Sequence, residues 1–193
     1  MFIFTFIGFP LEFTPYLIRG GNDKLSMRTA KYWIEKLGLE KHPEGGYFKE
    51  VYRSVEIIPK HGLHERYSGE RNHATSIYFL ITNNEFSAFH RIKSDEIWHF
   101  YAGSYITIHM IDENGKYSAL KLGSNPENGE VFQYTIPHGT WFAASVDEPD
   151  SFALVGCTVV PGFHYDDFEL GEKEELIKLF PQHEEIIRRF TRN

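Results

Sequence analysis

Short runs of apolar or alternating residues follow one another between residues 74 and 160, with turn-forming residues between them. The separating segments carry Asn, Gly and Pro, which favour turns for distinct backbone reasons. Many short strands at this spacing are typical of an antiparallel sandwich or barrel, and not of a parallel sheet with helical crossovers. The expected strands are residues 75–82, 86–92, 96–101, 105–111, 118–122, 131–136, 140–146 and 151–160. The sequence therefore predicts a mainly β fold.

Helical patterns flank this region. Ser26 is a candidate N-cap for a helix that runs to Leu37 and ends at Gly38. At the other end, residues 172–180 and 182–190 repeat apolar side chains at helical spacing, with a proline between the two segments. In addition, residues 47–53 are expected to form a strand and residues 59–71 a loop.

The first 26 residues differ from the rest in composition. Residues 1–17 are rich in Phe and Ile but contain two prolines and a glutamate. They are too short and too interrupted for a membrane helix of about 20 residues, and they lack the basic start of a signal peptide. Residues 20–23, Gly-Gly-Asn-Asp, then interrupt regular secondary structure before Met27. Two interpretations stay open: residues 1–26 are an arm or extra strand of the domain, or they are an extension before a start at Met27, with a single domain over 27–193.

Composition limits the function classes. The chain has 193 residues, of which 41% are hydrophobic, and a net charge of −7. This length supports one core, and the absence of a basic cluster argues against nucleic acid as a partner. We expect no membrane partner either. The single cysteine, Cys157, fits a reducing compartment, here the cytoplasm, and its apolar surroundings in the sequence predict a buried strand residue.

Two possible acid–base residues lie on either side of a predicted turn. Because side chains alternate along a strand, His90 and Ile92 share one face, and Glu96, Trp98 and Phe100 share a face of the next strand. We expect His90 and Glu96 to approach each other among these apolar residues, where burial raises the pKa of a carboxyl group and a neighbouring imidazolium lowers it. The pair could be a general base with its orienting partner, or a buried hydrogen bond without chemistry.

The spacing around this pair resembles the first motif of the cupin superfamily, G-x5-H-x-H-x3-E-x6-G. His90, Glu96 and Gly103 match, whereas Ile92 stands at the second histidine position. In the second motif, G-x5-P-x-G-x2-H-x3-N, a Pro-His-Gly turn at residues 137–139 matches, and Phe142 stands at the histidine position. The resemblance implies a double-stranded β-helix, that is, a jelly-roll cupin barrel with an N-terminal helix and C-terminal helices.

The same resemblance bears on metal binding. Of the four usual ligands only His90 and Glu96 remain, and catalytic metal sites typically use three protein ligands. We therefore predict no metal and no other cofactor. The alternative is a divalent ion at His90 and Glu96, for which His99 or His138 would have to supply further ligands.

Further stretches make the resemblance more specific. They are His-Pro-Glu-Gly-Gly-Tyr at 42–47, residues 50–54, 75–80 and 90–103, and residues 155–163 followed by 167–169. Together they resemble the Cupin_5 family, a domain of unknown function, and the resemblance covers about residues 28–190. It implies a homodimer and a similarity in fold to dTDP-4-dehydrorhamnose 3,5-epimerases. Function follows from such a similarity only by analogy.

The analogy assigns roles to several residues. His90 would remove a proton next to a carbonyl, Glu96 would orient it, and Tyr78 or Tyr101 would return a proton. The ligand pocket would be formed by Ile92, Trp98, Phe100, Phe142, Glu44 and Tyr47. The implied function is binding of a small molecule, a carbohydrate or nucleotide sugar, by a metal-independent epimerase or isomerase. A non-catalytic ligand-binding or sensor cupin and a metal-dependent cupin enzyme are the alternatives, so whether the chain is an enzyme stays open.

Overall fold

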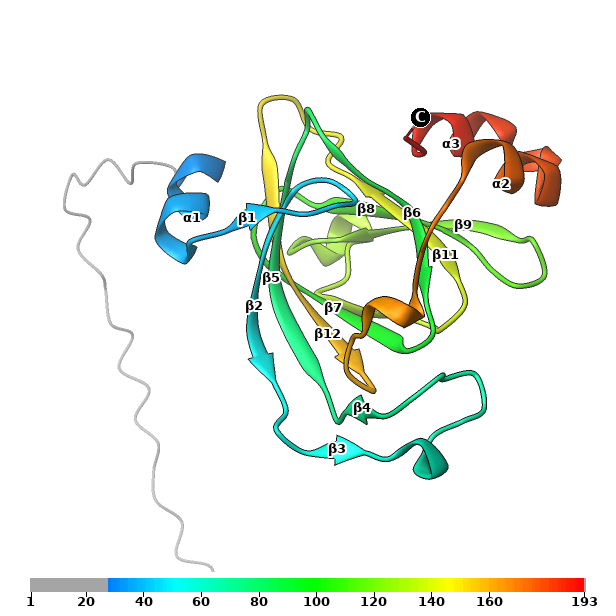
Figure 1. The fold of residues 1–193 in the computed structure, drawn as a ribbon. Helices are drawn as coiled ribbons and strands as arrows, with labels where there is room; N and C mark the ends of the chain where they lie inside the picture. Colours follow the sequence, from blue (N-terminus) through cyan, green and yellow to red (C-terminus); the bar gives the residue numbers. More distant parts are fainter. Residues whose placement is uncertain (1–27, 193) are drawn as a thin grey trace, which may run out of the picture.

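The computed structural model describes residues 28–192. The expectations for residues 1–26, for the cap at Ser26 and for a start at Met27 lie outside the described residues. The fold is mainly β and forms a jelly-roll barrel, with one helix before the strands and helices after them, as the sequence predicts (Figure 1).

Two sheets form the barrel, and neighbouring strands in both are antiparallel. The larger sheet has the order β1-β2-β5-β12-β7-β10 and the smaller one β13-β6-β11-β8-β9, while β3 and β4 form a separate pair. The strands are β1 Glu40–Lys41, β2 Tyr47–Arg53, β3 Ile57–Ile58, β4 Arg71–Asn72, β5 Thr75–Thr82, β6 Phe86–Ile92, β7 Asp95–Gly103, β8 Ile106–Ile111, β9 Tyr117–Leu122, β10 Gln133–Ile136, β11 Trp141–Ser145, β12 Phe152–Val160 and β13 Phe168–Leu170. All the predicted strands are present, with ends that differ by two residues at most.

The main core fills the space between the two sheets. Alternation sends one set of side chains inward from each strand, and the inward set includes Phe79, Trp98, Ile108, Phe142 and many smaller apolar residues. Phe79 packs edge-on against Trp98, with the ring centroids 5.8 Å apart. Polar inward residues are therefore exceptional, and those near one end of the barrel form the site described below.

Helices cover the outer faces of both sheets. Helix α1 (Ala30–Leu37) begins at Thr29, whose side chain accepts from the Tyr32 N–H, and ends at Gly38 with a φ of 63°. It packs near Leu80 and Leu154 on the larger sheet. Helices α2 (Lys173–Leu179) and α3 (Glu184–Arg189) cover the smaller sheet (Figure 1). Short 3-10 turns complete the chain: η1 (Lys60–Gly62), η2 (Pro126–Asn128), η3 (Tyr165–Asp167) and η4 (Pro181–His183). No helix of residues 28–192 is long and apolar enough to cross a membrane.

Gly103 ends β7 in a conformation that only glycine adopts without strain. Its φ is 98°, and a Cβ atom there would overlap the carbonyl oxygen of Phe152 on the neighbouring strand. Gly129 has a similar positive φ of 75°, but a Cβ there would meet no atom within 4 Å.

We predict that Gly103→Ala destabilises the protein more than Gly129→Ala. Both changes place alanine in a left-handed conformation, which costs about 1–3 kcal/mol, and only the first adds a steric overlap. Urea unfolding of both variants measures the difference. Equal losses in the free energy of unfolding would contradict this account of Gly103.

Candidate functional site

A cavity of about 100 Å³ lies between the two sheets, where β12 leads into β13. Its lining combines acid–base residues with apolar and aromatic ones. The acid–base residues are His42, Glu44, Glu50, His90, Glu96 and Cys157, and the others include Phe48, Ile77, Ile92, Phe163, Tyr165 and Phe168. An apolar wall with a few convergent polar groups is the usual lining of a ligand site.

His90 and Glu44 form the central pair of this cavity. His90 Nε2 lies 3.1 Å from Glu44 Oε2, and both side chains are buried. The other ring nitrogen, Nδ1, lies 2.8 Å from the carbonyl oxygen of Ala88. A carbonyl oxygen only accepts, so Nδ1 carries a proton, and the neutral ring has its lone pair on Nε2, facing Glu44.

The proton between Nε2 and Glu44 therefore has to come from one of the two groups. Burial lowers the pKa of His90 to about 3. Burial, and next the charge of Glu96, raise the pKa of Glu44 well above its usual range. Both shifts favour the neutral form, in which the Glu44 carboxylic acid donates to His90. The neighbouring His42 is also neutral. Its Nδ1 accepts the backbone N–H of Glu44 at 3.3 Å, and burial lowers the pKa of His42 to about 4.

A glycine pair places Glu44 inside the barrel. Gly45 and Gly46 follow with φ values of 116° and 74°, so the chain turns sharply into β2. At Gly46, a Cβ atom would lie 2.7 Å from the carbonyl oxygen of Leu80. The turn is also bonded to its neighbours, since the Ala88 N–H donates to the carbonyl oxygen of Glu44 at 3.0 Å. Glu44 is thus held by its backbone on both sides.

Glu96 lies on the sheet opposite His90, and this sheet also carries the turn that holds Glu44. Glu96 lies on β7 of the larger sheet, whereas His90 lies on β6 of the smaller one. Its side chain is buried beside Cys157, and burial raises the pKa of Glu96 to about 7. Burial, followed by the charge of Glu96, raises the pKa of the Cys157 thiol well above its usual range. Cys157 is thus a buried strand residue, as predicted, and also part of the cavity wall.

Two ion pairs fix the mouth of the cavity. Arg53 binds Glu50 through Nε at 3.0 Å and Nη2 at 2.6 Å, and its Nη1 donates to the carbonyl oxygen of Phe163 at 3.1 Å. Deeper, Arg71 donates to both oxygens of Asp167 in η3, and both side chains are 2% exposed. Removing one partner of such a buried ion pair typically lowers the free energy of unfolding by about 3–5 kcal/mol. These contacts hold the segment between β12 and β13 over the cavity.

The three tyrosines proposed from the sequence lie outside the cavity. Ile77 lines the cavity and Phe79 the core, so Tyr78 between them points to the outer face, where it packs with Leu80. Tyr101 is 50% exposed and its ring meets that of Tyr78 edge-on at 6.1 Å. Strand alternation is the physical reason, and it corrects both assignments as proton donors.

Tyr47 is corrected for the same reason. It packs in the outer cluster with Leu80, and the Lys41 ammonium group lies 3.9 Å from its ring centroid. The tyrosine that does line the cavity is Tyr165 in η3, which is 66% exposed at the mouth.

The other predicted pocket residues lie inside the barrel. Ile92 lines the cavity itself. Phe142 packs against the imidazole of His90, with ring centroids 4.0 Å apart, and Trp98 packs on Phe142 at 6.2 Å. Phe100 packs on the same core. The cavity is therefore not lined by Trp98, Phe100 or Phe142, which pack in the core next to the residues that line it.

The expected roles of Glu96 and Glu44 are partly exchanged. The carboxyl group that contacts His90 is that of Glu44, which the sequence placed only in the pocket, while Glu96 lies across the cavity. Sequence reasoning also missed His42, Phe163, Tyr165 and Phe168 as lining residues. The stretches 42–47 and 155–163 of the family resemblance were the available signal for the first two.

The donor set does not fit the four-ligand metal site of the cupin motifs. Ile92 and Phe142 occupy two ligand positions, and both nitrogens of His90 already have hydrogen-bond partners. Neither His99 nor His138 is among the residues lining the cavity, and His138 pairs with Asp95 at 2.9 Å. Within residues 28–192, no three His, Cys, Asp or Glu side chains are arranged to hold a metal ion. A metal-free protein stays a prediction, and the chemistry below uses the chain's own groups.

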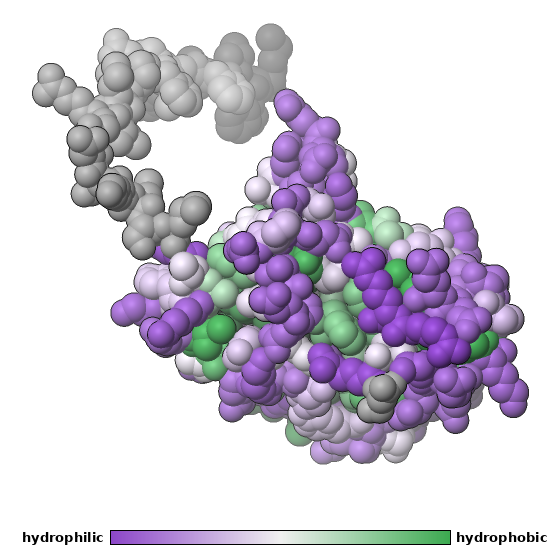
Figure 2. All heavy atoms as spheres, turned by 90° about the horizontal axis from the view of Figure 1, so that it is seen from above, coloured by the Kyte–Doolittle hydropathy of each residue, from purple (hydrophilic) through white to green (hydrophobic). Residues whose placement is uncertain are grey.

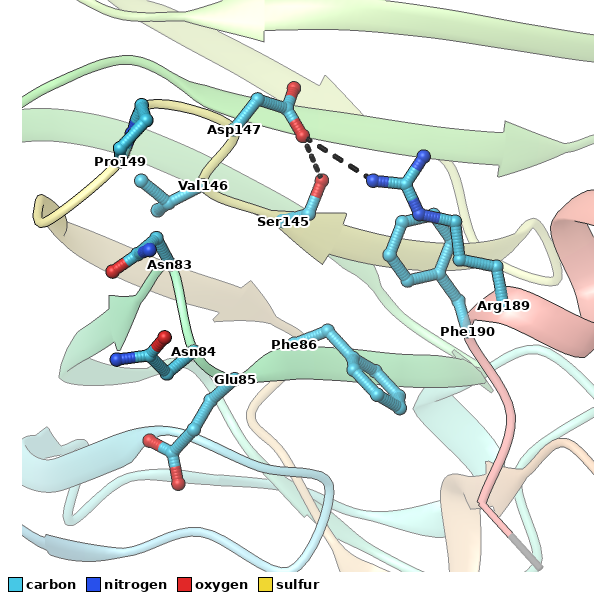
Figure 3. Close-up of a pocket in the computed structure, with 10 residues that line it drawn as sticks. All are labelled: Asn83, Asn84, Glu85, Phe86, Ser145, Val146, Asp147, Pro149, Arg189 and Phe190. Carbon is cyan, nitrogen blue, oxygen red and sulfur yellow. Dashed lines mark hydrogen bonds and ion pairs between the residues drawn. The ribbon is translucent and has the colours of Figure 1, made fainter.

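A second hollow of about 380 Å³ lies at the end of the barrel beneath α3 (Figure 3). Asp147 accepts from Thr107 at 2.7 Å and from Ser145 at 3.0 Å, and Arg189 lies 3.9 Å away. The charged groups of Asp147 and Arg189 thus neutralise each other.

Seen from above, the surface is mostly hydrophilic, with apolar side chains showing in the hollows (Figure 2). The interior cavity, with its buried acid–base groups, is therefore the stronger candidate site.

Comparison with known proteins agrees with this fold. The chain is 33% identical over 152 residues to an uncharacterised protein of Saccharomyces cerevisiae, covering 72% of this chain and 74% of the yeast protein. Among solved structures, a hypothetical protein from Leishmania major is 38% identical with a TM-score of 0.77, and a protein from Shewanella oneidensis is 39% identical with a TM-score of 0.78. Each comparison covers 86% of this chain and 99% of the other.

The sequence profile of one family also matches residues 31–171, which include every strand from β1 to β13. The family is described as a cupin superfamily domain, DUF985. With the barrel, the motif glycine Gly103 and the extent of this match in view, the chain belongs to the Cupin_5 family of the cupin superfamily.

Proposed function

We propose that this cupin binds a small carbonyl compound in its interior cavity and moves protons at the carbon next to the carbonyl, as a metal-independent sugar epimerase or isomerase. One observation carries the proposal. Glu96 on the larger sheet, Glu44 in the turn between β1 and β2, and His90 on the smaller sheet line the same apolar-walled cavity, and burial favours the uncharged form of each. Acid–base groups with such shifts cluster at functional sites.

The proposed chemistry assigns Glu96 the role of base. With a pKa of about 7, close to the pH at which a general base works best, its carboxylate takes the proton from carbon. The C–H electrons form the carbon–carbon double bond, and the carbonyl oxygen takes the proton that Glu44 shares with His90. For the isomer, Glu96 gives its proton to the former carbonyl carbon while Glu44 takes the proton of the neighbouring hydroxyl group. For the epimer, solvent water protonates the opposite face of the original carbon, Glu96 releases its proton to solvent, and the enol proton returns to Glu44.

The proposal predicts exchange of substrate protons with solvent. Wild-type protein in D2O should incorporate deuterium next to the carbonyl of at least one member of a panel of ketoses, aldoses and keto-sugar nucleotides, followed by proton NMR. Glu96→Gln should lower the rate by about 10²–10⁴-fold, the usual contribution of a general base. Glu127→Gln, in the exposed turn η2, is the matched control and should leave the rate unchanged.

Binding of a panel member without any exchange would contradict the catalytic proposal. It would instead support the alternative, a non-catalytic ligand-binding or sensor cupin. Exchange that persists in Glu96→Gln would contradict the role of that residue.

We also propose that the chain forms a homodimer. In addition to the sequence resemblance, exposed apolar side chains gather around β2 and β3, where Val51, Tyr52, Val55 and Ile57 are between 46% and 93% exposed. Contiguous exposed apolar residues often mark an interface. Light scattering should therefore give twice the chain mass of 22.5 kDa, and a mass of one chain would contradict the proposal.

A further inference from the structure

Acidic side chains outnumber lysine and arginine in the lining of the cavity. Glu44, Glu50 and Glu96 line it, and Arg53 is the one lysine or arginine among the described lining residues. The two lining histidines are neutral at pH 7, because burial lowers the pKa of His42 to about 4 and that of His90 to about 3.

The guanidinium group of Arg53 is already bound. It makes the two bonds to Glu50, and its Nη1 donates to the Asn72 side chain at 2.9 Å and to the Phe163 carbonyl oxygen at 3.1 Å. These bonds use four of the five N–H groups of the guanidinium group, and the Glu50 carboxylate beside them compensates its charge. The cavity thus offers a phosphate or carboxylate little uncompensated positive charge.

The two deeper carboxyl groups have little cationic compensation. Within residues 28–192, neither Glu44 nor Glu96 forms an ion pair with lysine or arginine, although both side chains are more than nine-tenths buried. The charge of Arg192 lowers the pKa of Glu44, which nevertheless stays well above its usual range. The charge of Glu96 also contributes to the raised pKa of Glu44. A positive charge between the two groups would favour the ionised form of both.

The apolar part of the cavity wall also suits a positively charged ligand. Phe48, Phe163 and Phe168 line the cavity, and their rings add surface that attracts a cation. Carboxyl groups behind aromatic side chains are a combination that recognises an organic cation and repels an anion.

We propose that the ligand of this cavity is a small organic cation, a compound with a protonated amino group whose charge lies between Glu44 and Glu96. The inference rests on the part of the proposed function that makes this cavity the ligand site. It narrows the ligand class, because it excludes phosphorylated sugars and nucleotide sugars from the interior.

Three probes of nearly equal size and different charge test the proposal: ethanolamine, ethylene glycol and glycolate. Each probe is titrated into the wild-type protein at about pH 8, and binding is followed by NMR. At this pH a carboxyl group with a pKa of about 7 is mostly ionised. Ethanolamine should bind at least about tenfold more tightly than ethylene glycol, and glycolate more weakly than either. Equal affinities, tighter glycolate binding, or no binding of ethanolamine would overturn the proposal.

Proton release gives a second measurement that needs no variant. Ethanolamine should displace protons from the carboxyl groups of the cavity near pH 7, so calorimetry in two buffers with different ionisation enthalpies should give different heats. The groups facing Glu96 are Glu44, His42, His90, Cys157, Glu50 and Arg53, and of these Glu44 can release a proton with it. Equal heats in the two buffers would count against a charge held between the carboxyl groups.

Variants locate the charge recognition. Glu96→Gln should abolish the preference for ethanolamine over ethylene glycol, and Glu127→Gln should keep it. An unchanged preference in Glu96→Gln would overturn the placement of the cation.

The outcomes also separate this inference from the proposed reaction. Exchange on neutral ketoses without amine preference overturns the ligand class alone. Amine binding without exchange on any panel member, with an amino ketose added to the panel, overturns the reaction alone.

Discussion

The structure depends on one constraint: nearly all side chains that point into the space between the two sheets are shielded from water. Most inward positions are apolar and form the core around Phe79 and Trp98. At the end next to β13, the inward positions carry His90 and Glu96, and the turn before β2 adds Glu44. Charged forms of these groups are costly there, so His90 and Glu44 share a proton as a neutral pair. The neutral pair, in turn, makes acid–base chemistry available without a metal ion.

Rigid supports hold these groups in place. The Glu44 turn is bonded to β6 through Ala88, and the closing segment is tied by Arg71 to Asp167 and by Arg53 to the Phe163 carbonyl oxygen. Functional groups need such support to keep their geometry within a fraction of an ångström. Arg53 illustrates how a charged residue at a site can serve the scaffold, since it bonds to Glu50, to the Asn72 side chain and to the Phe163 carbonyl oxygen.

Much of the fold and part of the site could be predicted from the sequence. Alternation and turn residues predicted the long strands, and motif spacing placed His90 and Glu96 on inward faces. Short strands such as Phe168–Leu170 carry too few residues for a periodic signal. The pairing of His90 with Glu44 could not be predicted, because a turn has no periodicity and the contact spans 46 positions. Tyr78 and Tyr101 were chosen by analogy, whereas alternation, with Ile77 and Phe100 inward, already argues for outward tyrosines.

The central claim is that burial raises the pKa of the two deep carboxyl groups of the cavity, Glu44 and Glu96, so that Glu96 titrates near neutral pH. Carbon-13 NMR of the glutamate side-chain carboxyl groups tests it most directly, with Glu96→Gln to assign the resonance. The account predicts a carboxyl signal that titrates with a midpoint of about 7 and is absent from the variant. A Glu96 signal that titrates near the ordinary glutamate value of about 4.3 would contradict it.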